Sequence, residues 1–246
     1  MENFLIVGQP RSGTTYLQTL LNAHDQVHCR GELFDPWQID DNGSKTAGLD
    51  AVIARDRDPL GFMDRMLAGE GMPEVADLRL LGAKVLFQHH PALFSQFVPQ
   101  RPRLKLIYVT RDNKLAQFAS GRQVAKTGQW TATTPAPLPP KIEAAPFWTA
   151  SECNRLVNED FLLRAWLETL VNPVLTVSYA GLFAADFKRQ VQEFLGVEPQ
   201  PDLASPLVKQ GQNRIIDRFE NADILARYFG ETGRGHWLEA ELTTES

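Results

Sequence analysis

An apolar run near the start of the chain leads through a glycine-bearing loop into a helical pattern, and this arrangement constrains the fold more than any other feature. Residues 4–7 (FLIV) predict a short buried strand, and residues 16–21 place apolar side chains on one face of a helix. The loop between them reads GQPRSGTT. Unpaired N–H groups in such a turn and at a helix N-terminus favour a bound phosphate or sulfate. The segment therefore predicts an anion-binding loop at the end of a strand.

The loop differs from the ATP- and GTP-binding loop G-x-x-x-x-G-K-[ST] at one informative position. Gly8 and Gly13 keep the glycine spacing, but Thr14 stands where that loop has its lysine. Because the lysine contacts the β- and γ-phosphates, a triphosphate would lose its main partner here. The basic group is instead Arg11, whose planar guanidinium can hold a tetrahedral oxyanion. An ordinary strand-to-helix turn is the alternative for the glycine spacing alone.

These residues resemble the sulfotransferases that use 3′-phosphoadenosine 5′-phosphosulfate (PAPS), whose 5′-phosphosulfate-binding loop reads P-[RK]-S-G-T-T. The resemblance continues through residues 17–24 and 31–34 and is closest to the bacterial carbohydrate, tyrosylprotein and Golgi-type branch. It implies direct transfer of a sulfuryl group from PAPS to a hydroxyl, with adenosine 3′,5′-bisphosphate as the product. The donor-binding residues that it implies in the loop are Arg11, Ser12, Gly13, Thr14 and Thr15.

Alternating patterns along the chain predict the rest of the fold. Strands are expected at 82–87, 104–109 and 174–177, and helices at 114–126, 150–170 and 187–195. Such alternation predicts an α/β fold, with a P-loop-like parallel sheet flanked by helices and right-handed crossovers. A chain of 246 residues with 43% hydrophobic content suits a single domain over 1–246 with insertions.

The expected helix at 150–170 is the longest in the chain. Its apolar stripe is expected to comprise Leu156, Phe161, Leu162, Ala165 and Trp166. These side chains would then pack into the core.

Two segments do not follow the alternation and are expected to be insertions on the acceptor side. Residues 35–79 open with a polar stretch rich in glycine and aspartate, which predicts irregular structure with short helices. Residues 131–152 begin with TATTPAPLPP, whose four prolines disfavour both helix and sheet. We expect this second segment to form a loop over the acceptor pocket, and a simple spacer is the alternative.

A second part of the donor site is expected after the strand at 104–109. Arg111 follows its carboxyl end, where ligands of open α/β sheets bind, and Ser120 lies on the next helix. In the family that the loop resembles, an arginine and a serine at these places donate to the donor's 3′-phosphate. Ser120 lies nine residues after Arg111, one more than in the family pattern. An arginine–aspartate surface pair with an unrelated serine is the alternative.

The segment 209–214 resembles the late basic segment with which the family completes its donor site. Lys209 is therefore expected to contact the donor. A solvated loop is the alternative.

Two candidates can serve as the base that takes the acceptor proton. Glu32 lies 21 residues after Arg11, where the tyrosylprotein branch has its catalytic glutamate, and it is the expected base. His89 or His90 is the alternative, because the cytosolic branch uses a histidine just after a lysine-containing strand. Arg11 is expected to stabilise the oxygen that leaves with the nucleotide.

Composition narrows the partners. A formal net charge of −5 argues against broad binding to nucleic acid or a polyanionic glycosaminoglycan. The resemblance implies that the acceptor is a hydroxyl of a small molecule, glycan or lipid. No metal is expected, since the sequence offers no carboxylate cluster and a sulfuryl group carries less charge than a terminal phosphate. Two rival functions remain open at this point, a kinase that uses a nucleoside triphosphate and a non-catalytic nucleotide-binding module.

Location and assembly are constrained less tightly. Cys29 and Cys153 give no disulfide framework, which fits a reducing compartment. The predicted strand begins at the first residues, and no apolar run approaches the ~20 residues that span a bilayer. We therefore expect a cytoplasmic protein, while the sequence gives no indication of its oligomeric state.

Overall fold

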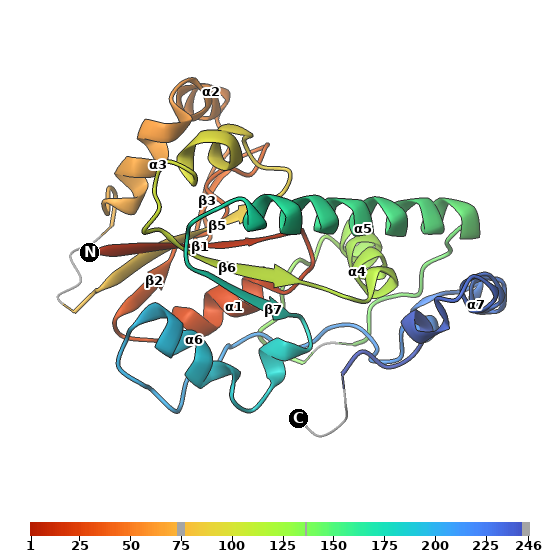
Figure 1. The fold of residues 1–246 in the computed structure, drawn as a ribbon. Coiled ribbons are helices and arrows are strands. Elements are labelled where there is room, and N and C mark those ends of the chain that lie inside the picture. Colours follow the sequence, from red (N-terminus) through yellow and green to blue (C-terminus); the bar gives the residue numbers. More distant parts are fainter. Residues whose placement is uncertain (73–76, 136, 243–246) are drawn as a thin grey trace.

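The computed structural model describes residues 1–72, 77–135 and 137–242. Its centre is a five-stranded, wholly parallel sheet in the order β2-β5-β1-β6-β7 (Figure 1). The strands are β1 (Glu2–Gly8), β2 (Val27–Cys29), β5 (Leu80–Leu86), β6 (Lys105–Thr110) and β7 (Val174–Ser178). Because β1 is central, the loop that follows it opens at the middle of the carboxyl edge of the sheet. This is the predicted P-loop-like α/β fold.

The sheet is buried on both faces, as its continuous apolar strands require. Phe4 and Ile6 of β1 belong to one core cluster, and Leu5 and Val7 belong to the opposite one. Helices α1 (Thr14–Leu21) and α6 (Phe187–Leu195) cover the first face, and α3 (Pro59–Leu67) and α5 (Pro146–Glu168) cover the second. Because alternate residues of β1 are buried on opposite faces of the sheet, β1 lies in the centre of the molecule.

A third apolar cluster lies beyond the carboxyl edge of the sheet. It joins α4 (Lys114–Thr127), the start of α5 and α7 (Ala222–Glu231). Short helical turns complete the fold at Leu93–Phe97, Gly181–Phe183, Ile215–Arg218 and Gly235–Leu238. This cluster anchors residues 215–238 next to the loop after β1.

The strands and helices expected from the sequence are confirmed to within a few residues. The apolar stripe expected on α5 is confirmed for Leu156 and Trp166, which pack into the core, but is wrong for Phe161 and Leu162. Phe161 and Leu162 are 67% and 53% exposed, whereas Leu163 and Leu167 are buried. Apolar residues occur all round this helix, so several faces fit a helical period. Contact with the sheet selects the face that carries Leu163 and Leu167, and contact with α4 and α7 buries Cys153 and Leu156 at the start of the helix.

The short helices expected in the segment 35–79 are confirmed, and the segment also holds a hairpin that was not expected. It contains a small antiparallel hairpin, β3 (Ile39–Asp41) with β4 (Ser44–Thr46), followed by α2 (Leu49–Arg57) and α3. Residues 73–76 of this segment, and residue 136 of the segment 131–152, lie outside the described residues. The division into a core and two acceptor-side insertions stays a prediction.

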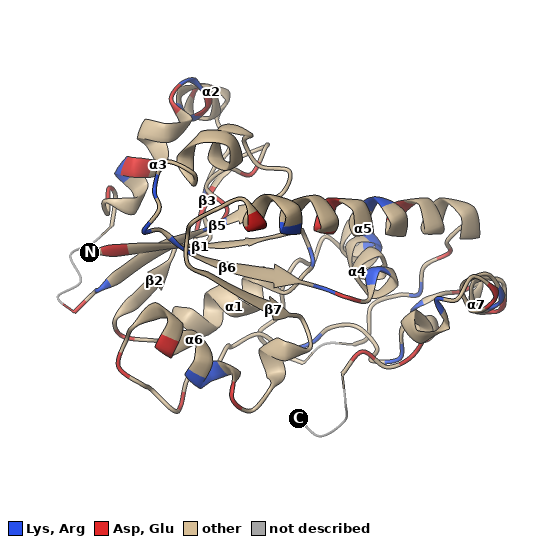
Figure 2. Ribbon diagram, viewed as in Figure 1, with Lys and Arg blue, Asp and Glu red and all other residues tan. Residues whose placement is uncertain are grey.

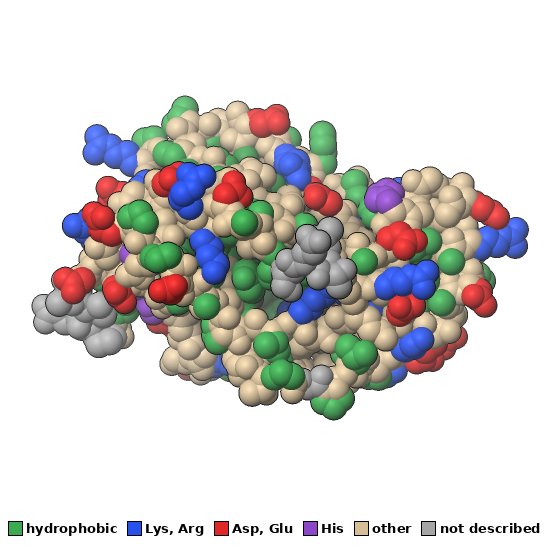
Figure 3. All heavy atoms as spheres, turned by 90° about the horizontal axis from the view of Figure 1, so that it is seen from below, with side chains coloured by type: hydrophobic (Ala, Val, Ile, Leu, Met, Phe, Trp, Pro, Cys, Tyr) green, Lys and Arg blue, Asp and Glu red, His purple; other side chains and the backbone are tan. Residues whose placement is uncertain are grey.

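Charged residues are sparse on the central strands and common on the surrounding helices and loops (Figure 2). On the face in Figure 3, acidic and basic groups are interspersed. In the described ranges, no helix is both long and apolar enough to cross a membrane.

Candidate active site

The backbone of the loop after β1 requires both of its glycines. A Cβ at Gly8 would lie 2.7 Å from the carbonyl oxygen of Val109 on the neighbouring strand. Gly13 has φ +105°, and a Cβ there would lie 2.8 Å from Leu182. Arg11 also has a positive φ, 64°, which is uncommon for a residue with a side chain. The loop therefore makes a tight turn in which each end is closely packed.

Two buried side chains donate hydrogen bonds to carbonyl groups of the loop. Gln117 of α4 donates to the carbonyl of Pro10 at 2.7 Å. Arg111 donates to the carbonyl of Arg11 at 2.8 Å. Since the first amides of a helix have no intrahelical acceptor, the start of α1 presents N–H groups on the other side of the loop. These contacts fix the shape of the loop that the sequence predicts to bind an anion.

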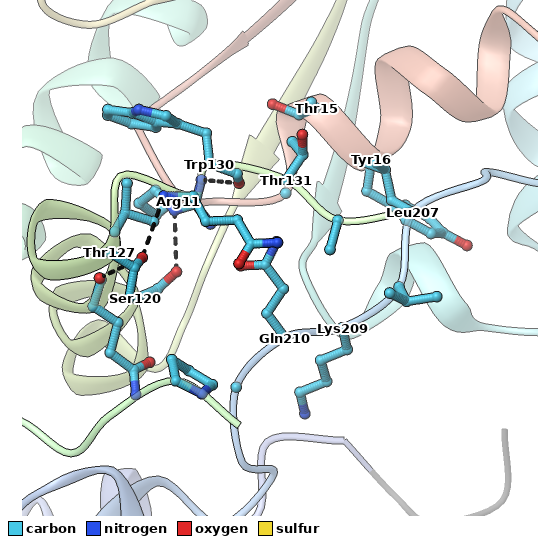
Figure 4. Close-up of a pocket in the computed structure, with 18 of the residues that line it drawn as sticks. Arg11, Thr15, Tyr16, Ser120, Thr127, Trp130, Thr131, Leu207, Lys209 and Gln210 are labelled. Carbon is cyan, nitrogen blue, oxygen red and sulfur yellow. Dashed lines mark hydrogen bonds between the residues drawn. The ribbon is translucent and has the colours of Figure 1, made fainter. Parts of the chain in front are cut away.

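A cavity of about 310 Å³ opens beside the loop. Its walls come from the loop, from α4, from the described parts of 129–140 and from 207–211 (Figure 4). The lining includes seven of the expected donor residues, Arg11, Gly13, Thr14, Thr15, Arg111, Ser120 and Lys209. Ser12 is different, because its buried hydroxyl donates to the carbonyl of Gln9 at 2.8 Å and so supports the turn.

Arg11 reaches across the cavity to residues far away in sequence. Its Nε donates to Oγ of Ser120 at 3.0 Å, and its Nη1 donates to the carbonyl of Trp130 at 3.1 Å (Figure 4). Burial, together with repulsion from Arg111, lowers the pKa of Arg11 to about 10. The guanidinium is still charged at neutral pH and lies beside the predicted 3′-phosphate serine.

The charged side chains among the described residues that line the rest of the cavity are all basic. Arg111, Lys209 and Arg218 also line it. Burial, with repulsion from Arg111, lowers the pKa of Arg218 to about 10, and burial, with repulsion from Arg218, lowers that of Lys209 to about 8. Arg218 was missed by sequence reasoning; it lies beyond the basic segment, and a Cβ at Gly211 would lie 3.0 Å from its guanidinium carbon.

One carboxylate approaches this cationic wall. Glu241 accepts from Nε and Nη2 of Arg111 at 2.6 and 2.5 Å in a two-pronged pair. Burial alone would lower the pKa of Arg111, but the hydrogen bonds and charge of Glu241 raise it. The guanidinium also lies 4.3 Å from the ring centroid of Tyr179. Nothing in the local sequence around Glu241 signals this pairing.

The two candidate bases, Glu32 and His89, lie together in a second cluster. Oε1 of Glu32 lies 3.0 Å from Nζ of Lys84 on β5, and Oε2 lies 3.4 Å from Nε2 of His89. Lys84 also donates to Oγ1 of Thr15 at 2.9 Å, which links the cluster to the anion-binding loop. Burial alone would raise the pKa of Glu32, but His89 and Lys84 together lower it to about 2. Glu32 is therefore ionised at neutral pH.

The two histidines differ in what their rings can do. The Leu86 amide donates to Nδ1 of His89 at 3.1 Å, so the proton of the neutral ring is on Nε2 and faces Glu32. The ring of His90 accepts from the Ala92 amide at 3.3 Å and lies 6.2 Å from the ring of Phe34. His89 thus belongs to the cluster through the approach of Nε2 to Glu32 at 3.4 Å, while His90 faces a different neighbour.

The proline-rich segment lies closer to the anion-binding loop than expected. Trp130, Thr131, Ala132 and Thr134, with residues 137–140, line the same cavity as Arg11. A role in a separate acceptor pocket stays a prediction.

Comparison with known proteins gives a consistent result. A family model described as "Sulfotransferase family" matches residues 3–202. Nodulation protein H of Rhizobium meliloti (strain 1021) is 32% identical over 229 residues, which cover 87% of this chain and 85% of the relative. Nodulation protein H of Rhizobium tropici is 31% identical over 141 residues, which cover 54% of this chain and 51% of the relative.

Solved structures give weaker matches. The crystal structure of sulfotransferase STF9 from Mycobacterium avium is 12% identical, with 98% of this chain and 78% of that chain covered and a TM-score of 0.47. The sulfotransferase domain from the curacin biosynthetic pathway is 14% identical, with 89% and 80% covered and a TM-score of 0.43.

Proposed function

Because the chain belongs to the sulfotransferase family, whose model matches residues 3–202, we propose that it transfers a sulfuryl group from PAPS to an acceptor hydroxyl. The bond between sulfur and the 5′-phosphate oxygen breaks as the acceptor oxygen bonds to sulfur. The acceptor proton passes to Glu32, and adenosine 3′,5′-bisphosphate leaves. The observation that carries this proposal is Lys84, which contacts both the candidate base Glu32 and Thr15 of the anion-binding loop.

The charge of the cavity supports a donor with two anionic groups. Arg11, Arg111, Arg218 and Lys209 line it, and Glu241 is the carboxylate paired with this wall. Buried positive charge without enough partners is costly, so an anion is favoured there. The loop after β1 suits a 5′-phosphosulfate, and Arg111 with Ser120 suits a 3′-phosphate, as guanidinium and hydroxyl groups both donate to phosphate.

The hydrogen bonds around Glu32 favour it over His89 as the base. The lone pair of His89 on Nδ1 is taken by the Leu86 amide, whereas Glu32 is an ionised acceptor. A carboxylate with a pKa of about 2 is a weak base, and general-base catalysis improves as the pKa approaches the working pH. Movement of Lys84 from Glu32 toward an anion in the loop would raise the pKa of Glu32 and strengthen it as a base.

Arg11 is the proposed partner of the leaving oxygen. Its guanidinium is charged, lines the cavity and is oriented by Ser120 and Trp130. Preorganised donors aimed at developing negative charge lower the barrier of group transfer. The proposed acceptor is a hydroxyl of a small molecule, glycan or lipid.

Thermal unfolding in the presence of nucleotides tests the donor. Adenosine 3′,5′-bisphosphate at 100 times its Kd should stabilise the protein by about 2.7 kcal/mol, and ATP with magnesium should stabilise it less. If ATP with magnesium alone raises the Tm, the proposed donor is wrong and the kinase alternative gains support. If adenosine 3′,5′-bisphosphate binds but PAPS is not turned over on a broad panel of hydroxyl acceptors, the protein is a non-catalytic nucleotide-binding module.

A further inference from the structure

The proposed function assigns the guanidinium of Arg111 to the 3′-phosphate of the donor. In this structure that guanidinium is already paired with the carboxylate of Glu241. Arg111 is only 4% exposed, and Glu241 takes its Nε and Nη2 donors, while the carbonyl of Arg11 takes one from Nη1. Two of the five N–H groups of an arginine are left for a ligand. A two-pronged carboxylate uses the same face of a guanidinium that a phosphate would use.

We propose that Glu241 competes with the 3′-phosphate of the nucleotide for Arg111 and so sets how strongly the site prefers nucleotides that carry this group. The inference rests on the proposed function, because it takes the 3′-phosphate as the natural partner of Arg111. In the free protein, Glu241 satisfies a buried charge. In the nucleotide complex, the phosphate dianion replaces it and pairs with a wall that also holds Lys209 and Arg218.

The position of Glu241 fits a displaceable group. Arg111 lines the main cavity, and Glu241 reaches it from an adjoining cavity of about 220 Å³ that shares Tyr179 with the first. The carboxylate is 6% exposed in its paired position. A second ion-pair partner for Glu241 is not found within the described ranges. Release of Arg111 therefore frees the carboxylate to turn toward solvent.

The backbone around Glu241 pairs with the segment that begins at Asn213, and the Ile215 amide donates to the carbonyl of Glu239 at 3.3 Å. The Glu241 amide donates to the carbonyl of Asn213 at 3.2 Å, and the Leu242 amide donates to Oδ1 of Asn213 at 3.1 Å. Lys209 donates to the same Oδ1. Loss of the Arg111–Glu241 pair therefore loosens a segment that is tied to another cation of the cavity wall.

Removal of the carboxylate gives a direct binding test. The Kd values of adenosine 3′,5′-bisphosphate and of AMP, which lacks the 3′-phosphate, are measured by calorimetry for the natural protein, Glu241→Gln and Glu239→Gln. Glu239 is a matched control, since it carries the same charge two positions away but its side chain is 66% exposed. Glu241→Gln should raise the preference for the bisphosphate over AMP by about tenfold, because charged hydrogen bonds are at stake, and Glu239→Gln should leave it within about twofold.

The outcomes of this binding test distinguish a failure of the proposed competition by Glu241 from a failure of the proposed donor. An unchanged or smaller preference in Glu241→Gln, with the bisphosphate still bound, overturns the competition and leaves the proposed function standing. Equal gains in both variants mean a general charge effect and also overturn it. If none of the three proteins binds the bisphosphate, the proposed donor itself is wrong.

A measurement on the natural protein avoids any loss of folding in the variant. Hydrogen exchange at the amides of Glu241 and Leu242 should speed up when adenosine 3′,5′-bisphosphate binds, since their segment loses its anchor on Arg111. AMP should leave it unchanged. Slower or unchanged exchange with the bisphosphate would contradict the competition.

Discussion

The two charged clusters beside the anion-binding loop are built differently. The first cluster, formed by Glu32, Lys84 and His89, pairs one carboxylate with one ammonium and one imidazole. The second cluster, formed by Arg11, Arg111, Arg218 and Lys209, brings four cations to one cavity and pairs them with one carboxylate, Glu241. One cluster is close to neutral, and the other has a surplus of positive charge.

This difference matches two different tasks. A balanced cluster keeps a carboxylate ionised and oriented without attracting a further ion, which suits a group that handles a proton. A buried surplus of positive charge is costly until an anion enters, which suits a binding site for a phosphorylated donor. Removing single groups from the first cluster should therefore affect turnover. Removing single groups from the second should affect donor binding, with the exception of Arg11, whose proposed contact with the leaving oxygen makes it matter for turnover as well.

The largest effect is expected from Glu32→Gln. The amide keeps the shape of the side chain but cannot take the acceptor proton, so kcat should fall by about 10²–10⁴-fold. The Kd of adenosine 3′,5′-bisphosphate should stay nearly the same, because Glu32 belongs to the other cluster. Steady-state kinetics with PAPS and calorimetry check the two parts. Full activity of Glu32→Gln, with loss in His89→Asn or His90→Asn, would transfer the role of base to a histidine.

Arg11→Gly should produce the next largest loss. Glycine accepts the φ of 64° at this position, so the turn keeps its backbone while the guanidinium is lost. We expect kcat to fall by about 10²–10³-fold, as when one oxyanion donor is removed. The Tm of the free protein serves as the control for folding. Retained turnover would show that the leaving oxygen has a different partner.

Lys84→Met tests how the first cluster controls its carboxylate. Glu32 is ionised above its pKa of about 2, and the positive charge of Lys84 helps to keep that pKa low. Removal of the charge raises the pKa, so the acid limb of the kcat profile should move up by about one to three pH units. The pH dependence of kcat measures this shift. An acid limb that does not move would separate Lys84 from the base.

The smallest effect concerns Lys209 and pH. Its pKa is lowered to about 8 by burial and by Arg218, so the ammonium loses its charge as the pH rises through that value. The affinity for adenosine 3′,5′-bisphosphate should then decrease by about two- to fivefold between pH 7 and 9, as expected for one partly exposed charge. Lys209→Arg keeps its charge over this range and should flatten the profile. A profile that is equally steep in both proteins would remove Lys209 from the donor site.

Much of the fold was predictable because it depends on short stretches of chain. The apolar runs of β1 and β6 and the helices α4 and α6 follow from local periodicity. The short strand β2 and the hairpin were not anticipated, since three-residue strands carry too little pattern. The buried face of α5 also needed tertiary contacts, because its apolar residues surround the helix.

In the candidate site too, some features follow from the local sequence and others depend on tertiary contacts. The sequence alone located the tight turn after β1, since Gly8 and Gly13 meet backbone requirements that act within a few residues of the turn, and anion binding there stays a prediction. It also pointed to Arg11, Glu32 and Arg111 as separate candidates, and their roles in catalysis and donor binding stay predictions. A motif can carry this information because its geometry is local.

Only the tertiary structure decided which charges meet. Lys84 joins Thr15 across 69 positions of sequence, and Arg111 joins Glu241 across 130. Such pairs depend on the order of strands in the sheet and on where the C-terminal segment returns, neither of which is written in any short stretch of chain. Charge balance in the site is therefore a property of the folded molecule, because Coulomb energy depends on distance in space and not along the sequence.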